Sequence, residues 1–303
     1  MKALVTGGAG FIGSHLVDAL LDDGAVVHVV DDFSTGRLEN LEWALERGSQ
    51  LHTADVTDEA AMIDLLSEVR PDLVCHLAAQ IDVRRSMAEP TADARMNVTG
   101  TVAILEAAHR CGASRFLLAS TAAVYGDPSA LPTPESHPVA PISGYGAGKA
   151  AAEIYLGSAS RRNGLSTLAL RMANVYGPRQ DPSGEAGVVT IFRRAVAAGE
   201  PVTVFGGGRQ TRDYVHVRDA VGAFLAAAHT PGVMGALNVA TGRETSVLAV
   251  ADALGATVLP GPERPGEIER SCLDPRAAWS ALGWRATTTL REDLEGRPDA
   301  IAA

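Results

Sequence analysis

VTGGAGFIGSH, residues 5–15, is the stretch that decides the predicted fold of this chain. Its glycines, Gly7, Gly10 and Gly13, follow the apolar residues 3–5 and precede an apolar pattern with helical spacing. Hydrophobic periodicity and glycine punctuation of this kind predict a strand, a tight turn and a helix.

The chemistry of this turn depends on the absence of side chains. Gly7 can adopt backbone angles closed to other residues, Gly10 leaves room for a diphosphate, and Gly13 lets the helix lie close to the strand. The unpaired amides and the positive dipole end of the helix favour an anion there. Glycine-rich turns also occur without ligands in α/β proteins, so the turn alone leaves a purely structural role open.

A second predicted strand, residues 26–30, ends in Asp31 and Asp32. A carboxylate at this position can accept both ribose hydroxyls of an adenosine, and it repels a 2′-phosphate. The sequence therefore favours NAD over NADP. Arg37 follows in a predicted loop, and we expect it to be solvated.

The bulk composition excludes several classes of protein. The 303 residues carry a formal net charge of −10, which argues against nucleic acid or an anionic membrane as a partner. No apolar run approaches the length of a membrane span and no signal peptide is expected, so we predict a cytoplasmic protein. Cys75, Cys111 and Cys272 are far apart in the sequence, and free thiols are expected.

Strand and helix patterns alternate as far as residue 171, which predicts an α/β fold with a doubly wound parallel sheet, the Rossmann fold. The further strands are expected at residues 51–54, 72–79, 115–120 and 166–171, and the longer helices at 60–69, 91–111 and 143–163. From residue 174 the chain becomes rich in glycine and proline. We predict an NAD-binding domain at 1–173 and a smaller α+β substrate domain at 174–303, with a later segment near 213–242 able to return to the first domain.

Ligands of open parallel sheets collect at the carboxyl ends of the strands, so Asp31, Asp55, Ala78 and Thr121 are expected on one rim. Asp55 can reach an adenine edge there, or it can serve as a loop carboxylate or helix cap. Both readings stay open.

Tyr145 and Lys149 lie four residues apart and therefore on one face of the helix predicted at 143–163. A nearby ammonium lowers a phenol pKa by roughly 1 to 3 units, so the pair can work as an acid and base, with Thr121 bonded to the same substrate hydroxyl. An isolated pair with this spacing is more often a surface feature. In this chain the pair follows a nucleotide-type turn and a strand-end threonine, which favours the catalytic role over the surface one.

Two other sequence patterns are interpreted as neither nucleotide-binding nor metal-binding. GYGAGKA, residues 144–150, lacks the glycine spacing and the hydroxyl residue of a Walker loop. His216 lies beside Asp213 and Asp219 without metal-ligand spacing, so we expect a structural histidine and no metal ion.

Together, the motifs VTGGAGFIGSH, DLVCHLAA, MNVTGT, STAAVYGD, YGAGK, LRMANVYGPRQ and RDYVHV resemble the extended short-chain dehydrogenase/reductases of the NAD-dependent epimerase family. Within them the chain looks most like bacterial, in particular actinobacterial, UDP-glucose 4-epimerases. The resemblance covers nearly the whole length.

The resemblance implies roles for individual residues. The catalytic residues are Thr121, Tyr145 and Lys149. The expected NAD contacts are Gly7, Gly10, Phe11, Ile12, Gly13, Asp31, Asp32, Ser34, Thr35, Gly36, Asp55, Val56, Leu77, Ala78, Ala79, Asn97, Tyr145 and Lys149. The expected contacts of the nucleotide sugar are Thr121, Asn174, Val188, Val204, Phe205, Arg212, Tyr214, Arg264 and Ser271, with the arginines on the diphosphate.

The resemblance also implies the reaction that this protein catalyses. Tyr145 takes the proton of the sugar 4-hydroxyl while hydride leaves C4 for NAD, the 4-keto sugar rotates, and hydride returns to the opposite face. Related dehydratases carry Asp-Glu directly after the strand-end threonine, and related decarboxylases carry an acid at the second of these positions, whereas this chain has Ala122 and Ala123. Ala173 replaces an aromatic residue of many epimerases, and the small Ser271 would admit an N-acetyl group, so UDP-N-acetylglucosamine is expected as a further substrate.

Other readings remain open at this stage. The main substrate can instead be UDP-N-acetylglucosamine or UDP-glucuronate, for which Arg84, Arg85, Arg179 and Arg193 are possible carboxylate partners. A non-catalytic NAD-binding sensor and a net sugar-nucleotide oxidoreductase are further alternatives. The resemblance implies a homodimer joined through the helices predicted at 91–111 and 143–163.

Overall fold

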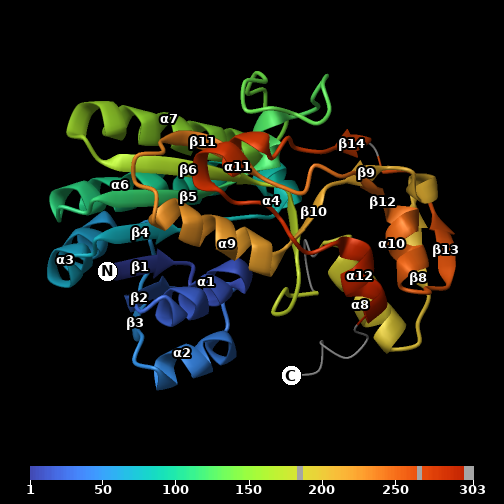
Figure 1. Cartoon of the computed structure of the whole chain (residues 1–303), viewed down its shortest axis with the longest axis horizontal. Coiled ribbons are helices and arrows are strands. Elements are labelled where there is room, and N and C mark those ends of the chain that lie inside the picture. The colour runs from blue at the N-terminus through green and yellow to red at the C-terminus, as the bar shows by residue number, and fades with distance from the viewer. Residues whose placement is uncertain (183–186, 265–267, 297–303) are drawn as a thin grey trace.

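A seven-stranded parallel sheet carries the larger part of the computed structural model, which describes residues 1–182, 187–264 and 268–296. Neighbouring strands follow the order β11-β6-β5-β4-β1-β2-β3 (Figure 1). The strands are β1 (Lys2–Thr6), β2 (Val26–Asp31), β3 (Gln50–Thr53), β4 (Leu73–His76), β5 (Arg115–Thr121), β6 (Ser166–Met172) and β11 (Gly235–Val239). The predicted doubly wound sheet is confirmed.

The central strands are apolar throughout because helices cover both faces of the sheet. In β1, Ala3 and Val5 belong to one hydrophobic core and Leu4 to the other, as the alternation of side chains along a strand requires. The first core lies under α1 (Phe11–Asp22), α2 (Glu42–Glu46) and α9 (Val217–Ala228), and the second under α3 (Glu59–Val69), α6 (Thr101–Arg110) and α7 (Gly144–Asn163).

A smaller lobe of short sheets and helices lies at the other end of the molecule (Figure 1). Its core contains apolar residues such as Phe192, Val204 and Val250. Its strands are β7 (Asn174–Tyr176), β8 (Val202–Phe205), β9 (Thr211–Arg212), β10 (Tyr214–His216), β12 (Thr245–Ser246), β13 (Val258–Gly261) and β14 (Arg270–Ser271), and its helices are α8 (Val188–Ala197), α10 (Val247–Ala253) and α12 (Leu290–Gly296).

The chain crosses back from the small lobe to the large sheet. β11 pairs with β6, and Phe224 of α9 and Trp284 after α11 (Arg276–Leu282) belong to the same core as Val17. β10, the other segment considered for a return, pairs with β7 instead. The division at residue 173 remains a prediction, and residues 183–186, 265–267 and 297–303 of the predicted second domain lie outside the described ones.

The helix predicted at 91–111 is present, but it is not α-helical throughout. The segment is divided into α5 (Pro90–Ala94), a π-helical turn (Arg95–Gly100) and α6. Such π turns are rare and have no distinct sequence signal, and they often occur at functional sites. No element was predicted at the short helix α4 (Val83–Ala88) or at strand β7. No helix in the described ranges is long and apolar enough to cross a membrane.

Candidate active site

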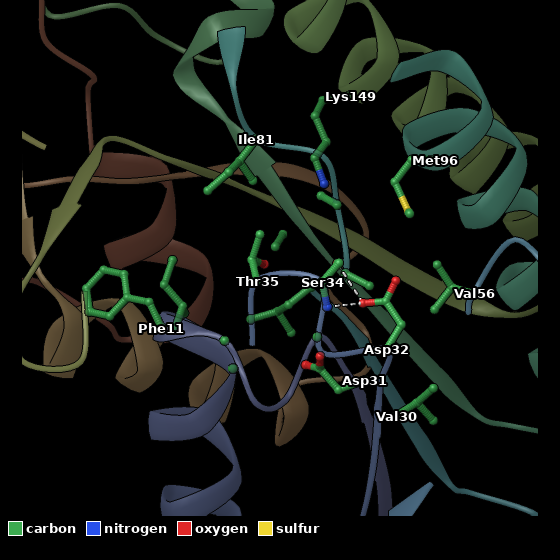
Figure 2. A pocket seen from close by; sticks show the side chains of 18 of the residues that line it. Phe11, Val30, Asp31, Asp32, Ser34, Thr35, Val56, Ile81, Met96 and Lys149 are labelled. Carbon is green, nitrogen blue, oxygen red and sulfur yellow. Dashed lines mark hydrogen bonds between the residues drawn. The ribbon is translucent and has the colours of Figure 1, made fainter. Parts of the chain in front are cut away.

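A cavity lies at the carboxyl ends of the strands of the large sheet (Figure 2). Most of the predicted cofactor contacts line it: Gly7, Gly10, Phe11, Ile12, Gly13, Asp31, Asp32, Ser34, Thr35, Val56, Leu77, Ala78, Ala79, Tyr145 and Lys149. Gly36, Asp55, Asn97 and Thr121 do not line it. Val30, Ala54, Ile81, Met96, Ala119 and Met172 line it without having been predicted.

The glycine turn forms one wall of the cavity. Gly7 has a φ of 67°, and a Cβ atom there would lie 2.7 Å from the backbone nitrogen of Ala78. A Cβ atom on Gly13 would lie 2.0 Å from the carbonyl oxygen of Gly7. No side chain caps α1, which begins after Gly10. The first-turn amides are therefore available for an anion, and the turn fits a dinucleotide.

Asp31 ties the end of β2 to this turn. Its Oδ2 accepts a hydrogen bond from the Ala9 amide at 2.8 Å, and its Oδ1 accepts one from the Phe33 amide at 2.9 Å. Burial raises the pKa of Asp31, and these two bonds oppose that shift. Gly36 packs directly on the carboxylate, since a Cβ atom there would lie 2.5 Å from Oδ1. Each oxygen keeps a lone pair with which to accept a ribose hydroxyl.

The neighbouring Asp32 is exposed and orients the loop that follows. Its Oδ1 accepts hydrogen bonds from the Ser34 amide at 2.9 Å and from the Ser34 hydroxyl at 2.6 Å (Figure 2). Arg37, which we expected to be solvated, forms a largely exposed ion pair with Asp181 at 2.7 Å. Its guanidinium is thus directed to a protein carboxylate.

A buried hydrogen-bond chain supports the segment 77–79 on the cavity floor. The Thr101 hydroxyl donates to the Asn97 carbonyl, so Nε2 of the fully buried His76 donates to Thr101 at 3.0 Å. Nδ1 of His76 then accepts from Thr6 at 2.7 Å, and Thr6 accepts from the Ala78 amide. Burial lowers the pKa of His76 to about 3, which keeps the imidazole neutral.

Asn97, predicted to touch NAD, lies outside the set of lining residues and positions the chain after Ala79, so its contact with NAD stays a prediction. Its Oδ1 accepts from the Gln80 amide at 3.0 Å, and its Nδ2 donates to the Gln80 carbonyl and to Asp93, each at 2.9 Å. It belongs to the π-helical turn and is buried. Asp55 is exposed and accepts from the Thr57 amide at 2.8 Å, as a turn carboxylate does. A contact of Asp55 with adenine stays a prediction.

Tyr145 and Lys149 enter the cavity from the first turns of α7, and Lys149 faces Asp31 and Asp32 across it (Figure 2). The Thr121 hydroxyl lies close enough to Tyr145 to oppose the rise in its pKa. Gly146 lets the helix approach Thr121 this closely, because a Cβ atom there would lie 2.5 Å from the Ala123 carbonyl oxygen. The three residues predicted to be catalytic therefore lie together.

Burial controls the protonation of this pair. It raises the pKa of Tyr145 to about 12; the Thr121 hydroxyl opposes that shift and the charge of Asp93 adds to it. It lowers the pKa of Lys149 to about 8 against the charges of Asp93 and Glu153. Lys149 is only 2% exposed, and a charged ammonium close to a phenol favours the phenolate form.

Apart from Thr121 at the end of β5, the predicted sugar contacts lie in the small lobe. The Arg264 guanidinium stacks on the Phe205 ring at 3.8 Å, and Ser271 is the register partner of Arg212. Arg264 also lines a second cavity between β8, β13 and β14. Val204 and Tyr214 are only 3% and 4% exposed and belong to the core of the lobe. Asn174 is the first residue of β7 and the partner of Tyr214, and Val188 begins α8.

The unpredicted lining residues have two origins. Four of them, Val30, Ala54, Ala119 and Met172, lie at or within two residues of the ends of β2, β3, β5 and β6, so the strand-end argument could have found them. Ile81 follows β4 in a loop and Met96 lies in the π-helical turn, and no sequence signal marks either. Within the described ranges, no group of three or more histidine, cysteine, aspartate or glutamate residues is suited to hold a metal ion.

A parallel sheet of this order, a glycine turn at its switch point and a paired tyrosine and lysine define an NAD-dependent enzyme of the short-chain dehydrogenase/reductase type. Residues 3–240 match the NAD dependent epimerase/dehydratase family, and the chain belongs to that family.

Individual relatives match over nearly the whole chain. It is 47% identical to the UDP-glucose 4-epimerase of Mycolicibacterium smegmatis, over 97% of this chain and 96% of that protein. The crystal structure of Thermotoga maritima UDP-glucose 4-epimerase with UDP-glucose is similar, with 42% identity, a TM-score of 0.94 and coverage of 99% and 98% of the two chains. The structure of UDP-N-acetylglucosamine 4-epimerase from Methanobrevibacter ruminantium in complex with UDP-N-acetylmuramic acid is also similar, with 33% identity, a TM-score of 0.92 and coverage of 99% and 97% of the two chains.

The neutral, buried His76 predicts a pH dependence of stability. Its pKa is lowered from 6.5 to about 3 in the folded protein, so the unfolded chain binds an extra proton between these values and stability falls as the pH falls below 6.5. We expect His76→Gln to flatten this fall by about 1 kcal/mol per pH unit between pH 6 and 4 in urea unfolding. Parallel curves for the wild type and the variant would contradict it. His109→Gln is the matched control.

Proposed function

We propose that this protein interconverts UDP-glucose and UDP-galactose by epimerisation at C4. The observation that carries the proposal is the joint placement of Thr121, Tyr145 and Lys149 beside a dinucleotide-type turn, with the small residues Ala122 and Ala123 next to them. The family of the chain and its similarity to UDP-glucose 4-epimerases support it.

The residues that would hold NAD are the glycine turn, Asp31 and the segment 77–79. NAD, when bound, accepts hydride from C4 of the sugar and returns it, and its nicotinamide cation adds positive charge to the site. Asp31 and Asp32 are the carboxylates among the described lining residues, and both lie at the end of the cavity opposite Lys149. A 2′-phosphate there would be repelled.

Tyr145 is the group that takes the proton of the sugar 4-hydroxyl and later returns it. The charged Lys149 favours the phenolate, and the Thr121 hydroxyl, which lies close to Tyr145, orients the same substrate hydroxyl. Because the proton and the hydride both return to the sugar, the net reaction needs no other acid or base.

Dehydration or decarboxylation of the sugar requires a catalytic group in addition to Thr121, Tyr145 and Lys149. Both need a group that handles a C5 proton or the departing fragment, and the short 3₁₀ turn Ala122–Tyr125 places methyl groups directly after Thr121. Epimerisation is therefore the reaction that the site supports best. The intact catalytic set also argues against a non-catalytic sensor.

The diphosphate is expected to contact Arg212 and Arg264, whose guanidinium groups suit phosphate oxygens. The small Ser271 in β14 leaves room beside the sugar, so UDP-N-acetylglucosamine is a second candidate substrate. UDP-glucuronate is less well supported. Arg85, Arg179 and Arg193 already pair with Glu89, Asp18 and Asp293.

Two further properties belong to this proposal. We place the protein in the cytoplasm, in galactose metabolism, where NAD and UDP-sugars are available; the free thiols of Cys75, Cys111 and Cys272 agree with a reducing compartment. We also propose a homodimer through α6 and α7. Ile154 and Tyr155 of α7 are 72% and 48% exposed, and Tyr155 lines a groove between these helices with Val102 and Leu105.

Tyr145→Phe tests the catalytic assignment. Without the hydroxyl no group can take the 4-hydroxyl proton, so we expect kcat to fall by about 100-fold or more while NAD remains bound. The measurement is a coupled UDP-galactose assay together with the NAD content of the purified protein. Tyr155→Phe, on the same helix, is the matched control, and near-normal turnover by Tyr145→Phe would refute the role.

Ser271→Tyr tests the breadth of the sugar pocket. A bulky side chain here should exclude the N-acetyl group, and we expect the ratio of UDP-N-acetylglucosamine to UDP-glucose activity to fall by about tenfold or more, the effect of an overpacked site. Ser271→Ala should keep the ratio. If Ser271→Tyr leaves the ratio unchanged, the N-acetyl group does not contact this position.

Ile154→Asp tests the dimer. A charge in the centre of an apolar interface should shift sedimentation from dimer to monomer, because a buried unpaired carboxylate costs several kcal/mol. Trp279→Asp places the same charge at another exposed apolar residue, on α11, and should leave the dimer intact. A wild-type monomer, or an Ile154→Asp variant whose dimer is as stable as that of the wild type, would show that α7 is not the interface.

A further inference from the structure

We infer that Asp93 is the counter-charge of Lys149, a positioning residue that acts through the lysine and sets the pH range over which the site works. This inference deepens the proposed function and rests on it for the catalytic consequence alone. Asp93 belongs to α5 and lies outside the set of cavity-lining residues.

Asp93 is a buried carboxylate with neutral partners. It is 3% exposed, and its Oδ1 accepts hydrogen bonds from the side-chain amides of Gln80 and Asn97, each at 2.9 Å. Amide donors stabilise a carboxylate but do not neutralise its charge. The other oxygen, Oδ2, faces α7, because a Cβ atom on Gly148 would lie 3.2 Å from it. Gly148 immediately precedes Lys149.

The second carboxylate near Lys149 is already neutralised. Glu153, one helical turn further along α7, is bound by the Arg171 guanidinium in a fork with contacts of 3.0 and 2.6 Å, and it accepts the Ser120 hydroxyl at 2.5 Å. This buried arrangement anchors α7 to the ends of β5 and β6. It leaves little net charge on the Glu153 side of the lysine.

The charge balance of the region then singles out Asp93. Lys149 interacts electrostatically with Asp93 from α5, Glu153 from α7 and His76 from β4. Tyr145 lies one helical turn away on α7, and Asp31 and Asp32 face the lysine only from the opposite end of the cavity. His76 is neutral because burial lowers its pKa, Tyr145 is neutral until it ionises, and Glu153 is paired with Arg171. A buried ammonium needs a compensating charge, and Asp93 supplies it.

Asp93 has two opposite effects on the tyrosine. It keeps Lys149 charged, which favours the phenolate, and its own charge raises the pKa of Tyr145. Loss of Asp93 therefore does not simply abolish activity. It lowers the pH at which Lys149 loses its proton, and the alkaline limb of the kcat profile moves to lower pH with it.

The sequence makes a direct test possible, because Lys2 and Lys149 are the only lysines of the chain. Protein labelled with [6-13C]lysine should give two lysine Cε signals, and Lys2→Arg assigns them. Asp93→Asn retains an oxygen that can accept both amide bonds while it removes the charge. We expect it to lower the titration midpoint of Lys149 by about one pH unit or more and to leave Lys2 unchanged.

The matched control is Glu89→Gln, which removes an exposed charge from the N-cap of the same helix and should not move the Lys149 midpoint. A Lys149 midpoint in folded Asp93→Asn that equals the wild-type value would overturn the inference. This titration needs no substrate, so its result is independent of whether the protein epimerises any sugar. Lack of turnover by the wild type would refute the proposed function instead.

A thermal-melting cycle covers the case in which Asp93→Asn folds poorly. If the two charges compensate each other, Asp93→Asn should lower the melting temperature by several degrees in the wild type and have almost no effect in a Lys149→Met background. Equal losses in both backgrounds would show that Asp93 has only a structural role, and the counter-charge assignment would be wrong.

Discussion

The proposed catalytic site depends on one constraint: the ammonium group of Lys149 must remain charged although it is almost fully buried. Burial alone lowers the pKa of this lysine, and a neutral amine could not favour the Tyr145 phenolate. The fold meets the constraint by packing α7 against α5 and against the ends of β5 and β6. The fork between Glu153 and Arg171 fixes the helix, and Gly146 brings its first turn close to Thr121.

The cofactor end of the cavity depends on hydrogen bonds within the protein. The glycine turn, Asp31 and the segment 77–79 are held by hydrogen bonds that end inside the protein, so the groups facing the cavity are fixed before a ligand arrives. The neutral His76 connects Thr6 to Thr101 under the floor and leaves no charge there. A rigid dinucleotide site and one buried positive charge suit a reaction that moves hydride and a proton and then returns both.

The sequence predicts the features that depend on local spacing. The apolar runs of β1, β2 and β5, the glycine turn, and the four-residue interval from Tyr145 to Lys149 are local patterns, and the structure places them as expected. The pairing of β7 with β10, the return of β11 to the large sheet and the π-helical turn depend on contacts between distant segments. For the same reason, spacing could not distinguish an NAD contact from a supporting role at Asn97, or reveal Asp93.

The central claim is that hydride leaves C4 and returns to the same carbon while the proton passes through Tyr145. Conversion of UDP-[4-2H]glucose by the purified protein, followed by NMR of the product, tests it most directly. The account predicts UDP-galactose that retains deuterium at C4, with no free reduced cofactor and no uptake of solvent hydrogen at that carbon. Loss of the label to solvent, or its accumulation in released NADH, would contradict the account.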